Sequence, residues 1–151
     1  WDSLAQLRKR WPHRLILKGV QTAADARRCM EMGLDGIVVT NHGGRQLDGA
    51  PATIDCLPAI AEAVRGQLTV LLDSGIRRGS DIAKACALGA DAVLLGRATL
   101  FGVAVGGQAG AAHALNLLEQ ELRRVLGLVG TPRLAELDRS KLLALRSVLV
   151  G

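Results

Sequence analysis

The chain has 151 residues, of which 49% are hydrophobic, so it is long enough to bury one core, and its formal net charge is +5. The basic residues are dispersed, and one Phe, two Trp and no Tyr offer no stacking surface, so we expect no nucleic-acid partner. Three cysteines without metal-like spacing argue against a disulfide framework and a metal site, and no apolar run approaches the ~18 residues of a membrane span.

Four short apolar runs predict buried strands, and helical patterns alternate with them. The strands are expected at residues 15–18, 37–40, 68–72 and 92–95, which is the spacing of βα units. A helix at 2–10 precedes the first strand, and helices at 22–32, 54–64 and 79–88 separate the four, with an early break expected at Pro58. Consecutive βα units predict an α/β fold with a parallel sheet and right-handed crossovers.

Local signals mark the ends of these helices. Thr22 and Asp25 resemble a capping box, and Gly33 suits a left-handed helix end. A weak internal repeat relates residues 29–39 to residues 85–95, because each contains a helix end, a glycine, an aspartate and a buried strand. The repeat supports the division of the chain into βα units.

After Phe101 the pattern becomes helical only. Residues 106–128 predict one long amphipathic helix, in which His113 packs or faces solvent. Thr131 followed by Pro132 predicts the start of another short helix, and residues 140–149 predict a leucine-rich one. The apolar side of the long helix is expected to contain Leu115, Leu118, Leu122, Val125 and Leu126.

The second predicted strand opens directly into polar residues and glycines. His42 and Arg45 follow Thr40, separated by Gly43 and Gly44, and glycines let a backbone turn tightly or approach a ligand. A lone histidine after a strand is usually a loop residue, and paired glycines are usually only a turn. An imidazole that titrates near neutral pH and a fork-shaped cation together suit proton abstraction and anion binding. We therefore predict a base and an anion-binding residue in this loop.

Glycines and arginines also follow the third and fourth strands. Glycines expose backbone N–H groups, arginines make charge-assisted bonds, and a helix N-terminus adds its dipole. Phosphate sites built from the last two βα loops recur in (β/α)₈ barrels. The alternative is a pair of ordinary strand–helix turns with solvated arginines. The predicted phosphate cradle consists of Asp73, Ser74, Gly75, Arg77, Gly96 and Arg97.

Taken together, these loops resemble the FMN-dependent α-hydroxy-acid oxidase and dehydrogenase family, which includes glycolate oxidase, lactate oxidase and mandelate dehydrogenase. The resemblance is carried by residues 17–19, 41–48, 73–79 and 96–97 and covers nearly the whole chain. Other FMN barrels share the phosphate loop, so the His-Gly-Gly-Arg-Gln segment is what narrows the match to this family.

The resemblance implies a (β/α)₈ TIM barrel and FMN as the cofactor. It makes His42 the active-site base, and Arg45 would bind the substrate carboxylate. Lys18 would lie beside the N1/C2 carbonyl edge of the flavin, which Thr40 would also touch. Thr40 and Ser74 depart from the commonest family pattern, which has Ser and Gly there, and Ser74 points weakly to the mandelate-dehydrogenase branch. The ribityl-phosphate end would be held by Asp73, Ser74, Gly75, Arg77, Gly96 and Arg97.

The family's barrel has eight strands, and this chain accounts for four, which would be strands five to eight. Two active-site tyrosines and an aspartate that orients the base come from the first half in the family, and this chain has no Tyr. We therefore expect residues 1–151 to be the C-terminal half of a single FMN-binding (β/α)₈ barrel domain, with its N-terminal half as a partner.

The expected reaction is FMN-dependent oxidation of an L-2-hydroxy acid, of the lactate, glycolate or mandelate type, to the 2-keto acid. Whether His42 takes a proton from C2 or from the hydroxyl stays open, as do the electron acceptor and the substrate side chain. The alternatives are another FMN- or phosphate-binding TIM-barrel enzyme and a non-catalytic half-barrel module. We also expect a cytoplasmic homo-oligomer (tetramer or octamer), with any membrane contact at the inner face and through the N-terminal half.

Overall fold

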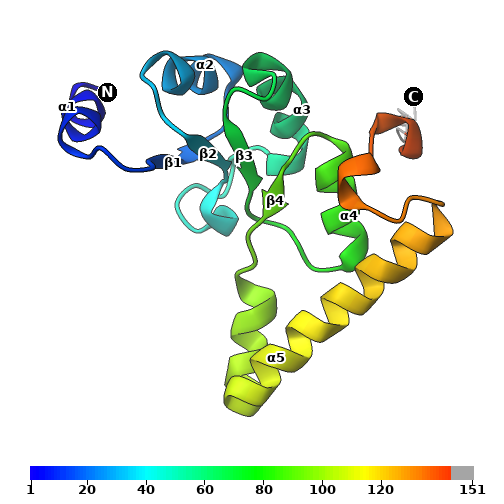
Figure 1. Cartoon of the computed structure of the whole chain (residues 1–151). Coiled ribbons are helices and arrows are strands. Elements are labelled where there is room, and N and C mark those ends of the chain that lie inside the picture. The colour runs from blue at the N-terminus through cyan, green and yellow to red at the C-terminus, as the bar shows by residue number, and fades with distance from the viewer. Residues whose placement is uncertain (144–151) are drawn as a thin grey trace, which may run out of the picture.

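The computed structural model describes residues 1–143 and contains one four-stranded sheet in which every pair of neighbours is parallel. The strands lie in chain order, β1-β2-β3-β4 (Figure 1). This confirms the predicted series of βα units. The strands are β1 (Ile16–Val20), β2 (Gly36–Val39), β3 (Thr69–Leu72) and β4 (Ala92–Val93).

Helices pack on one face of this sheet and bury the core. They are α2 (Ala23–Glu31), α3 (Thr53–Val64) and α4 (Gly79–Ala87), while α1 (Asp2–Arg10) lies beyond β1 at the end of the sheet (Figure 1). Ile37 and Val39 of β2 and Leu57 and Ile60 of α3 are fully buried together. Alternate strand residues face the other way, and there Ile16 is 45% exposed in the described chain. The sheet therefore has one covered face and one open face.

The internal repeat has a structural explanation at the amino-terminal edge of the sheet. The Asp35 carboxylate accepts a hydrogen bond from the Leu15 backbone N–H (2.8 Å), and the Asp91 carboxylate accepts one from the Val70 N–H (2.7 Å). In both cases the aspartate that follows a helix binds the start of the preceding strand. The glycines of the repeat, at positions 33 and 89, have the expected positive φ of 72° and 107°. The repeated motif thus joins each new βα unit to the one before it.

Two details of the predicted units are wrong. Pro58 does not break its helix, because α3 runs continuously from Thr53 to Val64. Proline removes one backbone hydrogen bond there, but the buried residues Leu57 and Ile60 on either side of it keep the helix packed against the sheet. The fourth strand is shorter than predicted: its last backbone contact with β3 is the bond from Leu94 N–H to Leu72 O (2.8 Å).

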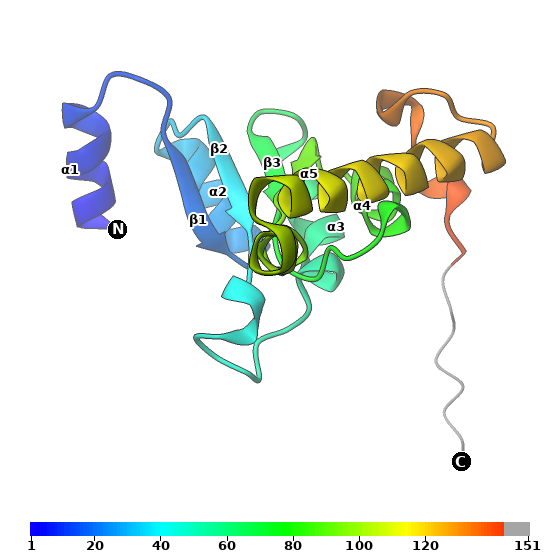
Figure 2. The same cartoon turned by 90° about the horizontal axis from the view of Figure 1, so that it is seen from below.

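The long helix predicted at 106–128 is present, and a helical segment that was not predicted precedes it. Helix α5 (Arg97–Leu128) has non-helical backbone at Gly106 and Gly107, which divides it into a first segment at 97–105 and a longer second one. The second segment crosses α4 where a Cβ on Gly79 would come within 2.2 Å of the Leu122 backbone nitrogen. Away from that crossing α5 projects from the sheet (Figures 1 and 2). Leu115, expected on the apolar side, is therefore 47% exposed.

The chain after α5 also differs from the prediction. Thr131 is buried and its N–H donates to Leu126 O (3.0 Å), so it ends the α5 turn and does not start a helix with Pro132. Two short 3₁₀ turns follow, η2 (Leu134–Glu136) and η3 (Arg139–Lys141). The helix predicted at 140–149 lies mostly outside the described residues. Within residues 1–143 we find no helix with the length and hydropathy that a membrane span requires.

Candidate active site

The carboxyl-terminal ends of the four strands surround one broad cleft of about 1200 Å³. Nine of the ten site residues predicted from the sequence line it, and the tenth, Thr40, is fully buried beside it. The sheet topology explains this, because parallel strands end at the same edge. The nine residues that line the cleft are Lys18, His42, Arg45, Asp73, Ser74, Gly75, Arg77, Gly96 and Arg97.

A network of hydrogen bonds joins three of the strand ends at the base of the cleft. The Asp73 carboxylate accepts hydrogen bonds from the Thr40 hydroxyl (2.7 Å) and from the Lys18 ammonium. The Thr40 and Ser74 hydroxyls lie 3.1 Å apart. The Gln21 amide donates to the Thr40 backbone carbonyl (2.9 Å) and so attaches the loop after β1 to the loop after β2.

Asp73 is held in its ionised form by this network. Partial burial of the carboxyl opposes ionisation, but hydrogen bonds from Lys18 and Thr40, together with the Lys18 charge, hold the pKa of Asp73 below its usual range. The Lys18 side chain is 47% exposed, against 17% for Asp73. In this pair the Lys18 ammonium is therefore exposed to the cleft, and the Asp73 carboxylate lies below it, mostly buried.

The loop that carries His42 has an unusual backbone. The φ angles of His42, Gly43 and Gly44 are 55°, 69° and 77°, so three consecutive residues are left-handed. A non-glycine residue rarely adopts this conformation unless its surroundings hold it there. The His42 N–H donates to the Thr40 hydroxyl (3.0 Å), which is one such restraint.

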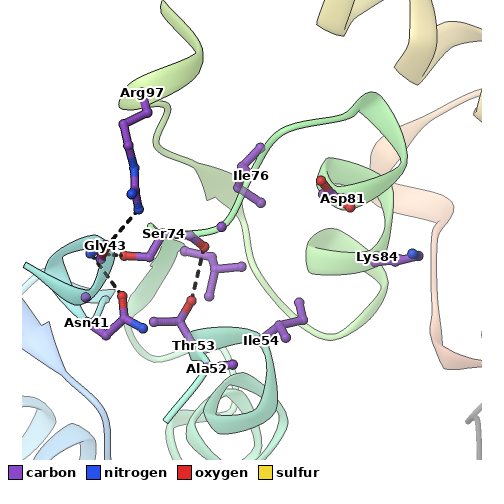
Figure 3. Close-up of a pocket in the computed structure, with 13 residues that line it drawn as sticks. Asn41, Gly43, Ala52, Thr53, Ile54, Ser74, Ile76, Asp81, Lys84 and Arg97 are labelled. Atoms are coloured by element: carbon purple, nitrogen blue, oxygen red, sulfur yellow. Dashed lines mark hydrogen bonds between the residues drawn. The ribbon is translucent and has the colours of Figure 1, made fainter. Parts of the chain in front are cut away.

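The Gly43 peptide is held on both sides by other strand ends. Its N–H donates to the Asn41 side chain and to the Ser74 hydroxyl, each at 3.0 Å, and its carbonyl accepts from the Arg97 guanidinium (2.9 Å). A Cβ at this position would come within 2.8 Å of that guanidinium and would displace it, and the φ of 69° also favours glycine here. Figure 3 shows Arg97 and Ser74 converging on Gly43.

The His42 ring lies over the end of β1. Its Nε2 atom is 3.7 Å from where a Cβ on Gly19 would stand. The register of β1 against β2 shifts between Lys18 and Val20, so Gly19 forms an irregularity in the strand there. Bulges of this kind re-aim neighbouring side chains at the ends of strands. The irregularity leaves Lys18 and His42 on the same wall of the cleft.

The predicted phosphate cradle is divided in the structure. Asp73 and Ser74 take part in the network with Lys18 and Thr40, whereas Gly75, Arg77, Gly96 and Arg97 line the cleft outside that network, and α5 begins at Arg97. The backbone N–H groups of Arg77 and Arg78 are not free to bind a ligand, since both donate to the Asp81 carboxylate (3.0 and 2.9 Å). The arginine side chains and the start of α5 are therefore the groups available to an anion.

A second, smaller cavity of about 380 Å³, whose lining Figure 3 shows, shares Gly43, Ser74 and Arg97 with the cleft. At its edge the buried Thr53 hydroxyl donates to the carbonyls of Asp73 (2.9 Å) and Ser74 (3.3 Å). We did not predict Thr53, Gln21 or Asn41 as site residues from the sequence. The partners of Gln21 and Thr53 are 19 to 21 residues away along the chain, so only the fold brings them together, whereas Asn41 accepts from Gly43, two residues further on.

The arrangement suits a ligand that carries both a phosphate and a second anionic group. Two arginines and the start of α5 line the cleft together with a lysine, a histidine and Arg45. Within residues 1–143, His, Cys, Asp and Glu side chains form no group of three or more that could bind a metal ion. The cleft can thus supply cations and one imidazole side chain.

Comparison with known proteins agrees with this description. The family model described as FMN-dependent dehydrogenase matches residues 1–144. An L-lactate oxidase of Nostoc sp. is 54% identical over 140 residues, which are 93% of this chain and 38% of that protein. An L-lactate dehydrogenase of Chromohalobacter salexigens is 49% identical over 142 residues, 94% of this chain and 36% of that protein.

Solved structures give the same result. The crystal structure of (S)-mandelate dehydrogenase, described as a monotopic membrane protein, has a TM-score of 0.91 and 47% sequence identity, and the match covers 95% of this chain and 38% of that one. The chain therefore spans little more than a third of the proteins it matches. The likeness confirms the predicted fold class, a (β/α)₈ barrel of which this chain supplies the last four βα units and the helices that follow.

Proposed function

This chain belongs to the FMN-dependent dehydrogenase family, and from that premise we propose that it forms part of an enzyme that oxidises an L-2-hydroxy acid to the 2-keto acid. The observation that carries the proposal is the single cleft that His42, Arg45 and Lys18 line together with the two arginine loops. Lactate, glycolate and mandelate are the candidate substrates, since relatives of this chain are named for lactate and mandelate.

The cleft fits FMN in both size and chemistry. Its volume of about 1200 Å³ exceeds that of most small-ligand pockets, and a Cβ on Gly75 or Gly96 would meet nothing within 4 Å, so the space above both glycines is open. Arg77, Arg97 and the start of α5 would bind one phosphate. Lys18 would lie by the flavin ring. When bound, FMN supplies the acceptor for the two electrons that leave the substrate.

His42 would act as the base. Its ring is exposed to the cleft. Its backbone N–H donates to the Thr40 hydroxyl, and the carbonyl of the next residue, Gly43, accepts a hydrogen bond from Arg97. A base held on a rigid loop removes a proton efficiently because the entropy cost of positioning it has already been met by folding. His42 would take the proton from the C2 carbon or from the hydroxyl of the substrate and hold it on its ring nitrogen.

Arg45 would bind the substrate carboxylate. The backbone N–H of Arg45 donates to the His42 carbonyl (3.4 Å), so His42 and Arg45 belong to one backbone turn. Both residues line the cleft. A guanidinium binds a carboxylate through two parallel hydrogen bonds, which fixes the orientation of the acid as well as its position. That orientation would present C2 to His42.

Lys18 and Asp73 would serve the flavin together. Lys18 would place a positive charge beside the flavin, and Asp73 accepts a hydrogen bond from that lysine and so restrains it. Because the pKa of Asp73 is lowered, the carboxylate stays ionised at neutral pH and remains an acceptor for Lys18 and Thr40.

We propose further that residues 1–151 are the C-terminal half of one barrel domain and need the N-terminal half. The open face of the sheet exposes Ile16 and Leu94, and both outer strands lack a neighbour on one side among the described residues. In a closed barrel every strand is paired and this face is buried. The two halves together are called the assembled enzyme below. We expect it to be a homo-oligomer, and any peripheral membrane contact would be made by its N-terminal half.

The test uses the assembled enzyme with L-lactate, glycolate and (S)-mandelate in turn. We expect yellow protein whose cofactor is FMN by mass spectrometry, and loss of flavin absorbance when a substrate is added without oxygen. Residues 1–151 expressed alone should self-associate, bind flavin poorly and not turn over. Recovery of a dinucleotide cofactor, or a monodisperse and active monomer of residues 1–151 alone, would refute the proposal.

A further inference from the structure

Ser74 adopts a backbone conformation that its side chain disfavours. Its φ is 80°, in the left-handed region where glycine is common and other residues are rare. A strained residue of this kind persists only when neighbouring groups hold it, and it is found most often at functional sites.

Thr53 provides the restraint on the Ser74 backbone. It is the first residue of α3, is 3% exposed, and donates its hydroxyl hydrogen to the carbonyls of both Asp73 and Ser74. The left-handed turn at position 74 is therefore fixed from α3. Thr53 also ends the loop that begins with Asn41.

The hydroxyl of Ser74 makes two contacts in the other direction, toward the start of that same loop. It accepts a hydrogen bond from the Gly43 N–H (3.0 Å) and lies 3.1 Å from the Thr40 hydroxyl. Residue 74 thus contacts the His42 loop at both ends, through its side chain at Gly43 and through its carbonyl at Thr53. Figure 3 shows the two contacts on opposite sides of Ser74.

The direction of the contact between the two hydroxyls follows from Asp73. The carboxylate is ionised, since hydrogen bonds and the Lys18 charge outweigh burial and lower its pKa, so it can only accept. Thr40 therefore gives its one hydroxyl hydrogen to Asp73, at 2.7 Å. The hydrogen between Thr40 and Ser74 must then come from Ser74. The bonds run in one direction, from Gly43 N–H through Ser74 and Thr40 to Asp73.

We propose that Ser74 is a positioning residue for His42, which links the loop of the base to the Lys18–Asp73 pair. The proposal rests on the function assigned to His42 above. Glycine at position 74 would leave the Gly43 N–H with Asn41 as its one side-chain acceptor and would take a donor from Thr40. The loop would then have fewer restraints on its left-handed backbone, and His42 would spend more time away from the reacting atom.

Two variants of the assembled enzyme test this. Ser74→Gly removes the hydroxyl and relieves the strain, while Ser74→Ala removes the hydroxyl and keeps a side chain at the strained position. We expect kcat to fall on the order of tenfold in both, because small displacements of a catalytic group are costly, with KM and FMN affinity changed less than about twofold. Ser80→Ala is the control, since Ser80 belongs to α4 and does not line the cleft.

Hydrogen exchange gives a readout that does not depend on turnover. Backbone exchange over residues 41–46 should accelerate on the order of tenfold in both Ser74 variants and stay unchanged in Ser80→Ala. The proposal would be overturned if Ser74→Gly matched the wild type in both exchange rate and kcat. It would also be overturned if only Ser74→Ala showed an effect, because that effect would come from backbone strain and not from loss of the hydroxyl. A wild-type assembled enzyme without activity would refute the function assigned to His42, and with it the positioning role.

Discussion

The two edges of the sheet use aspartate in opposite ways. At the amino-terminal edge, Asp35 and Asp91 accept hydrogen bonds from backbone N–H groups near the starts of neighbouring strands. At the carboxyl-terminal edge, Asp73 accepts from the side chains of Lys18 and Thr40. Backbone donors are fixed once the fold forms, whereas side-chain donors can differ between related enzymes. In barrels of this kind the first edge serves stability and the second serves chemistry.

Backbone strain is divided in the same way. In the repeated turns at the amino-terminal edge, the left-handed positions are glycines, at 33 and 89, which adopt them at little cost. At the carboxyl-terminal edge, His42 and Ser74 are left-handed although both carry side chains. Of the three non-glycine residues with positive φ in the described chain, two therefore lie where the proposed chemistry takes place, and the third, Arg65, ends α3 at the other edge. If the two edges differ in this way, substitutions at the carboxyl-terminal edge should change the catalytic rate, and substitutions at the amino-terminal edge should change the free energy of unfolding.

The largest effect is expected from His42→Ala in the assembled enzyme. Loss of a general base typically lowers the rate 10²- to 10⁴-fold, so we expect kcat to fall roughly 10³-fold. The melting temperature should not change, because the His42 ring is exposed. Anaerobic flavin reduction measured by stopped flow, beside a thermal melt, checks both. A variant that keeps a tenth of the wild-type rate would remove His42 from the base role.

Arg45→Lys should have the next largest effect. Lysine keeps the charge but lacks the planar fork, so the carboxylate would lose one of two charge-assisted hydrogen bonds. We expect kcat/KM for the hydroxy acid to fall roughly 10- to 100-fold, with a higher KM, a lower kcat and FMN still bound. Steady-state kinetics with a flavin absorbance spectrum measure this. An unchanged kcat/KM would place the carboxylate elsewhere.

Asp91→Ala tests the opposite edge. It leaves the N–H of the buried residue Val70 without its acceptor, which typically costs about 1–3 kcal/mol of unfolding free energy. We expect a lower urea midpoint and an unchanged kcat in the fraction that stays folded. A loss of kcat without a loss of stability would contradict the division of roles between the two edges.

The sequence predicted the fold and the site residues better than it predicted their contacts. Buried strands and the Gly–Asp repeat are local patterns, so the four βα units could be placed to within a few residues. The helical segment at 97–105 was not predicted. The passage of α3 through Pro58 depends on packing against the sheet, which local patterns do not contain.

The same limit applies within the site. His42, Arg45 and the phosphate loops stand out because each follows a predicted strand. The roles of Thr53 and Gln21 do not, because each acts on a backbone carbonyl 19 to 21 residues away along the chain. The hydrogen bond from Arg97 to Gly43, between residues 54 positions apart, is likewise a product of the sheet order and no local motif encodes it.

The smallest expected effect concerns pH and distinguishes Asp73 from its neighbours. Its pKa in the folded chain lies below the unfolded value of about 3.9, so the carboxylate stabilises the fold above that pH, and this contribution is lost as the pH falls through the folded pKa. The wild type should therefore be more stable than Asp73→Asn at neutral pH, and the difference should shrink below pH ~4. Urea unfolding of both assembled proteins at a series of pH values measures it. Asp35 also has a lowered pKa, but it is present in both proteins and cancels in the comparison. A difference that is constant with pH would mean that Asp73 does not titrate as part of the Lys18–Thr40 network.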